Sequence, residues 1–76
     1  MSETGIILRD ALETLFEELD DQRAKADLRR PMAQLEFAPA SMRRWLEAEN
    51  AAQKTTGQII DIYMLLFALQ ANDAGD

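Results

Sequence analysis

The chain has 76 residues, of which 14 are acidic and 8 are basic, and it contains no cysteine or histidine. These absences exclude disulfides and thiolate metal sites, and they remove the commonest metal ligand and general base. The net charge of -6 argues against general binding to nucleic acid or anionic membranes. A chain of this length is near the lower size at which one hydrophobic core outweighs chain entropy. We therefore expect a single α-helical domain over residues 1–76 that gains support from a second copy or a partner.

The N-terminal residues lack the basic region of a secretory signal peptide. No apolar run approaches the roughly 20 residues that a membrane-spanning helix needs. The sequence therefore predicts a cytoplasmic protein that does not associate with a membrane.

The first half of the chain has apolar residues at the spacing of one helix face. They are Leu8, Leu12, Leu15, Phe16 and Leu19. This pattern predicts an amphipathic helix over residues 4–29. Beyond residue 21 the apolar residues move to nearly the opposite side of the helix, so the helix must bend or present two faces to different neighbours. Pro31 disfavours the helical conformation of the residue before it, which predicts a connector over residues 30–38 with a short helical turn.

A second helix is predicted over residues 39–70, because Pro39 suits the first turn of a helix. Residues at a spacing close to 3.5 per turn form one seam along this helix: Met42, Trp45, Ala52, Thr56, Ile60, Tyr63 and Phe67. We expect Tyr63 and Phe67 of this seam to lie in the core. Thr55, Thr56 and Gly57 are poor helix formers, so a break at residues 55–57 is the main alternative. Residues 71–76 are expected to form a frayed polar tail.

The predicted fold is all-α, a helical hairpin of two main helices with a short helical turn at the connector, completed to a four-helix bundle by dimerisation or by a partner. Residues 59–69 form an almost complete apolar collar in which only Asp61 is charged. One antiparallel helix covers about one face of such a collar, so we expect Ile62, Leu65, Leu66 and Leu69 to contact a partner. The alternative is that residues 31–37 fold back and cover this collar within one copy.

The basic middle of the chain allows a second interpretation, a helix-turn-helix DNA-binding regulator that uses Arg43 and Arg44. Three residues argue against it. Pro31 falls within the first helix of that motif, Met32 stands where a small residue usually packs, and Glu36 occupies a turn that favours glycine. The arginines would otherwise pair with glutamates across antiparallel helices.

No motif of an enzyme is present. The chain has no glycine-rich phosphate loop and no nucleophile signature, and its adjacent carboxylates are typical of a solvated helix face. We expect no catalytic activity, no cofactor, no bound metal and no small-molecule substrate. The sequence favours a small protein–protein interaction module, with a regulatory, adaptor or chaperone-like role, that binds another protein or a second copy through an apolar helix face.

Overall fold

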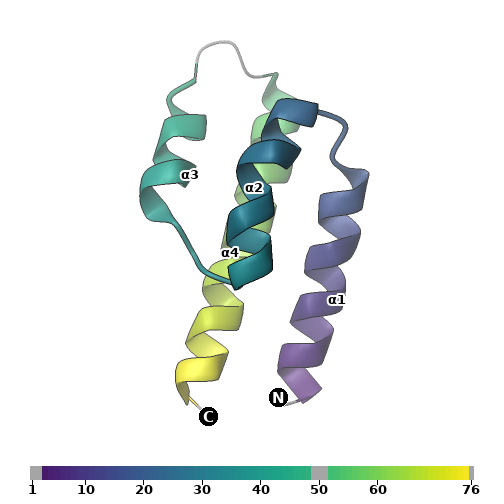
Figure 1. The fold of residues 1–76 in the computed structure, drawn as a ribbon, viewed down its shortest axis with the longest axis vertical. Coiled ribbons are helices and arrows are strands. Elements are labelled where there is room, and N and C mark those ends of the chain that lie inside the picture. The colour runs from purple at the N-terminus through teal and green to yellow at the C-terminus, as the bar shows by residue number, and fades with distance from the viewer. Residues whose placement is uncertain (1–2, 49–51, 76) are drawn as a thin grey trace.

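The computed structural model describes residues 3–48 and 52–75, with side chains as far as residue 72. Four helices lie within these residues: α1 (Glu3–Glu18), α2 (Gln22–Gln34), α3 (Pro39–Leu46) and α4 (Gln53–Gly75). The helix α4 contacts all three of the others, and Figure 1 shows α1 and α3 on opposite sides of the pair formed by α2 and α4. The radius of gyration is 12.2 Å, close to the roughly 11 Å expected for a compact chain of this length. The prediction of an all-α fold is confirmed, whereas the structure does not show a hairpin of two main helices, because each predicted helix is interrupted.

The first interruption lies at residues 19–21, where one helix was predicted to continue to residue 29. Asp21 has an extended backbone, and its side chain accepts a hydrogen bond of 3.0 Å from the backbone N–H of Ala24, so it caps the N-terminus of α2. Leu19 is buried in the core at the break. The shift in the apolar pattern beyond residue 21 therefore marks a change of helix.

Pro31 does not end a helix, contrary to the prediction, but lies inside α2. A proline in a helix interior removes one hydrogen bond and crowds the preceding turn. Here Ala24, Leu28 and Pro31 recur at helical spacing and are all buried, so packing of this face offsets that cost. The helix ends at Gln34, and Leu35 directly after it adopts the left-handed conformation (φ 51°). The Glu36 N–H donates to the Pro31 carbonyl at 3.1 Å, as in a Schellman motif.

The second interruption separates α3 from α4, so the predicted continuous helix over residues 39–70 is also wrong. Pro39 begins α3 as expected. The alternative break at residues 55–57 is wrong as well, because these residues lie inside α4, and residues 49–51 are outside the described residues. The residues of the predicted seam are divided between α3 and α4. Met42 and Trp45 of α3 pack against the same core that contains Tyr63 of α4.

The helix α4 also continues beyond residue 70 to Gly75, so most of the predicted polar tail is helical. Alanine has the highest helix propensity, and Ala71 and Ala74 lie in this last stretch. The C-terminal end of α4 lies at the same end of the molecule as the N-terminus of α1 (Figure 1).

Candidate contact surfaces

The residues predicted to contact a partner lie inside the single chain. Ile62, Leu66 and Leu69 have no exposed surface, and Leu65 is half-buried and packs against the core. They are covered because α4 packs against three helices, whereas the prediction assumed one antiparallel neighbour. Ile62, Leu66 and Leu69 therefore offer no exposed surface to a partner in this structure, and their contact with a partner stays a prediction.

The connector between α2 and α3 takes part in covering α4. The backbone N–H of Phe37 donates to the Gln70 side-chain oxygen at 3.1 Å, which holds the connector against α4. The Phe37 ring lies edge-on to Tyr63, with 6.2 Å between ring centroids. This arrangement resembles the alternative in which residues 31–37 fold back over the collar, although most of that segment is helical.

A different face of α4 remains apolar and open to solvent. Ile60, Met64, Phe67 and Ala71 are spaced by four, three and four residues, so they lie on one side of the helix. We call this set the α4 strip. Met64 is 56% exposed and Phe67 is 54% exposed, while Ala71 is exposed and Ile60 is half-buried. Phe67 had been predicted to lie in the core, and its exposure corrects that prediction.

The α4 strip is joined to the core by aromatic contacts. The ring of Phe67 lies edge-on to Phe37, with 5.4 Å between centroids and 78° between planes. Phe37 in turn contacts the fully buried Tyr63. Because the exposed ring is braced by a half-buried one, Phe67 presents a fixed apolar surface to solvent.

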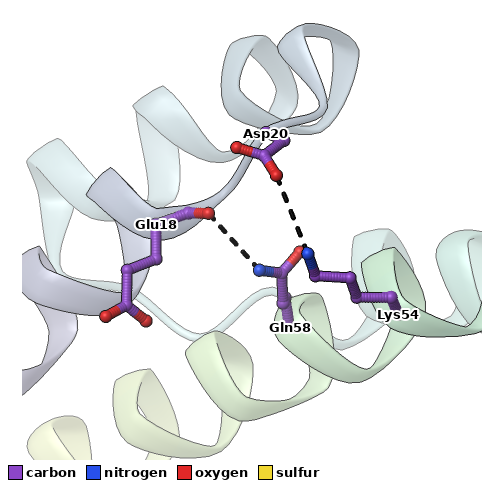
Figure 2. A network of polar contacts seen from close by, with 4 residues as sticks. All are labelled: Glu18, Asp20, Lys54 and Gln58. Atoms are coloured by element: carbon purple, nitrogen blue, oxygen red, sulfur yellow. Dashed lines mark hydrogen bonds and ion pairs between the residues drawn. The ribbon is translucent and has the colours of Figure 1, made fainter.

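Polar contacts join the C-terminal end of α1 to the start of α4. The Gln58 side-chain amide donates to the Glu18 carbonyl at 3.4 Å, and Lys54 lies 3.8 Å from an oxygen of Asp20 (Figure 2). The two side chains of this ion pair are 76% and 88% exposed, so solvent screens it and it contributes little to stability. These contacts mark the α1–α4 pair as antiparallel.

The two arginines of the alternative prediction are exposed in the last turn of α3. An Nη atom of Arg44 donates to the Ser41 hydroxyl at 3.1 Å. A recognition helix reads bases mainly with residues near its N-terminus. The first turn of α3 carries Pro39 and Ala40, which offer no long polar side chain. The geometry therefore does not favour DNA reading by Arg43 and Arg44.

The basic side chains do not form the expected ion pairs with the glutamates that the structure describes, and Glu49 lies outside the described residues. Among the described residues, the ion pair of Lys54 with Asp20 is the one present. Lys25 of α2 lies over the Phe16 ring instead, with 5.6 Å from its Nζ to the ring centroid.

An open groove of about 490 Å³ separates α2 from α3. Its lining is mostly polar and consists of Asp27, Arg30, Pro31, Gln34, Glu36, Ala38, Ser41 and Arg44. Sequence reasoning missed this groove, because the break that creates α3 as a separate helix was not predicted.

Tyr63 of α4 does not line this groove, but three residues of the groove lining influence the pKa of its side chain. It is fully buried, and its hydroxyl has no hydrogen-bond partner. Burial raises the pKa of this phenol; the Ser41 hydroxyl lowers it, Asp27 raises it and Arg44 lowers it. All three influencing residues line the groove.

Comparison with protein families, curated proteins and solved structures finds no match to this chain. In the part of the chain that the structure describes, no helix is long and apolar enough to cross a bilayer. The same residues contain no cluster of carboxylates that could hold a metal ion. The candidate surfaces are therefore assessed from their own chemistry.

Proposed function

We propose that this chain is a small protein–protein interaction module, and that the α4 strip is its contact surface. The observation that carries the proposal is the exposure of Met64 and Phe67, which are both more than half exposed on the same face of α4. Aromatic and methionine side chains are enriched at protein interfaces relative to the rest of the surface. Covering the exposed half of each side chain would contribute roughly 1 kcal/mol.

The mode of contact is that of a helix lying in an apolar groove or against another helix. Residues at spacings of three and four along one helix are the usual anchors of such contacts. The ring of Phe67 is already fixed against Phe37, so little side-chain entropy is lost when a partner covers it. The partner is another protein or a second copy of the chain.

Substitutions on α4 and α3 test this proposal. The double variant Met64→Gln with Phe67→Gln should keep its helical circular dichroism and lose association. Leu46→Gln is the matched control, because Leu46 is also about half exposed, at 48%, but lies on α3. Sedimentation velocity measures self-association, and co-purification from cells measures a different partner. Equal association of the double variant and the control would contradict the proposal.

A further inference from the structure

The exposed side of α4 carries a glycine that the fold of one chain does not explain. Gly57 lies inside α4, is exposed and does not have a positive φ. A glycine inside a helix lowers stability relative to alanine, so it is expected where a side chain would clash or where φ is positive. In the described part of the chain, no atom beyond the local helix backbone lies within 4 Å of the place where its Cβ would stand. The gap at Gly57 can therefore accept an atom from outside the chain.

Gly57 extends the α4 strip by one turn. The strip and this glycine occupy positions 57, 60, 64, 67 and 71, which are separated by three, four, three and four residues. This spacing repeats every 3.5 residues and is that of a seam where two helices pack side by side. Figure 1 shows α2 in front of α4, with α1 and α3 to its two sides, and all three contact α4. Among the described helices, none covers the exposed Met64 and Phe67.

The seam is complementary to itself when two copies of α4 run antiparallel. With a two-fold axis at the level of residue 62, each residue faces the one at the same distance on the other side of the axis. Phe67 then faces Gly57 of the other copy, since each is five residues from the axis. Met64 faces Ile60 in the same way. The largest side chain of the seam therefore lies opposite the position that has no side chain, and this alternation of large and small residues gives close packing.

The charges on this side of α4 do not oppose contact with a second copy. The net charge of -6 is unevenly distributed. Seven acidic residues lie in residues 3–21, against the single basic residue Arg9. The exposed residues of α4 between positions 53 and 71 carry one positive charge, on Lys54, and one negative charge, on Asp61. Two copies that meet through α4 therefore keep most of their acidic residues apart.

The exposed apolar area is that of a weak dimer. About 100 Å² of each Met64 and Phe67 side chain is open to solvent, and a two-fold pair covers four such side chains, roughly 400 Å² in all. With the small and polar residues beside them, the contact falls in the class below about 1,200 Å², which is that of weak interfaces. We expect the dimer to form at high micromolar concentration.

We propose that the α4 strip, extended by Gly57, binds the same surface of a second copy of the chain. The two α4 helices run antiparallel, and each Phe67 ring lies over Gly57 of the other copy. This inference rests on the proposed function, because it names the partner of the α4 strip.

Disulfide formation between introduced cysteines tests the pairing, and the natural chain has no cysteine that could interfere. In the proposed register, position 53 of one copy faces position 71 of the other, and both Gln53 and Ala71 are exposed. A mixture of the Gln53→Cys and Ala71→Cys chains should form mainly the mixed disulfide under mild oxidation. Each chain alone is the control, because its two cysteines lie about 27 Å apart along the paired helices. Equal yields in the mixture and the controls, or no disulfide at high micromolar concentration, overturn the proposal.

Filling the gap at Gly57 tests the register by sedimentation equilibrium. Gly57→Leu should weaken self-association at least about tenfold, because the added side chain occupies the place of the Phe67 ring. The fold should be kept, since that place is open in the single chain. Ala26→Leu is the control, because it enlarges another small exposed helical residue, on α2. Equal association of these two variants would contradict the register.

Asp61 gives a second signature of the two-fold pair. The two Asp61 side chains would lie one residue from the axis and on the same side of the paired helices, so they repel each other. Asp61→Asn and added salt should therefore both strengthen self-association. Asp10→Asn removes the same charge from an exposed position on α1 and should have a smaller effect. Weaker association of the Asp61→Asn chain counts against the two-fold pair.

The outcomes also separate this inference from the proposed function. A chain that stays monomeric at high micromolar concentration, while Met64→Gln with Phe67→Gln abolishes co-purification of a different protein, overturns the second copy as partner. The α4 strip then remains a contact surface. If the double variant changes neither self-association nor co-purification, both the inference and the proposed function are overturned.

Discussion

Truncation of two neighbouring residues on α4 should have very different effects on stability. Leu66 is fully buried and Phe67 is 54% exposed. Leu66→Ala opens a cavity in the core and should cost about 3 kcal/mol. This is a large part of the roughly 4–11 kcal/mol typical of a chain of 76 residues. Phe67→Ala loses less than half of the burial of a phenylalanine and one edge-on ring contact, so it should cost about 1–2 kcal/mol.

Urea unfolding followed by circular dichroism measures both free energies, because a chain this small is expected to unfold in one cooperative step. The measurement should be made at low protein concentration, so that association does not add to the stability. A free energy loss for Phe67→Ala as large as that for Leu66→Ala would refute the reasoning, since it would mean that Phe67 is part of the core.

Three other changes test local features of the fold. Asp21→Ala should lower the free energy of unfolding by about 1 kcal/mol, because the cap on α2 is lost, and Asp20→Ala is the exposed control. Gly57→Ala should raise the thermal midpoint by the equivalent of about 1 kcal/mol, because Gly57 lies inside α4 with open space where a Cβ would stand. A lower midpoint would contradict that reasoning. Burial raises the pKa of Tyr63, so stability should be intact below about pH 10 and fall as the pH rises above it. Tyr63→Phe should remove the part of this loss of stability that comes from ionisation of the buried phenol. Identical dependence of stability on alkaline pH in the two chains would contradict this role of Tyr63.

Local patterns in the sequence predicted the helical class and the starts of two helices, near residue 4 and at Pro39. The leucine spacing of residues 8–19 is that of α1, and Pro39 marks the start of α3. The shift in apolar pattern beyond residue 21 indicated a bend, but Asp21 could not be identified as a cap without knowing where the helix stopped. Capping residues are also common inside helices, so their presence alone does not locate a break.

Whether Pro31 ends the helix depends on contacts with residues that are distant in the sequence. The rule that proline ends a helix concerns the local backbone. In this chain the buried face formed by Ala24, Leu28 and Pro31 offsets the local cost. The local sequence predicts the cost of placing a proline inside a helix. The contacts that offset this cost form only where α2 packs on α4.

The residues predicted to contact a partner lie mostly on the buried side of α4, whereas Met64 and Phe67 lie on its exposed apolar side. The apolar collar of residues 59–69 indicated that α4 has many neighbours, and three helices provide them. Which side stays open depends on where α1, α2 and α3 lie around α4. That arrangement follows from the break at residues 19–21 and from the separation of α3 from α4, and neither was located from the sequence.

The central claim is that the α4 strip, rather than another exposed apolar residue, is the contact surface. Placing a photo-reactive amino acid at position 64 in one chain and at position 46 in another, followed by irradiation in cells, tests this claim directly. Both native side chains, Met64 and Leu46, are about half exposed. The two positions should therefore cross-link equally often to proteins that they meet by chance. The account predicts a discrete cross-linked product from position 64 that is absent from position 46. Equal cross-linking from both positions, or a product from position 46 alone, would contradict it.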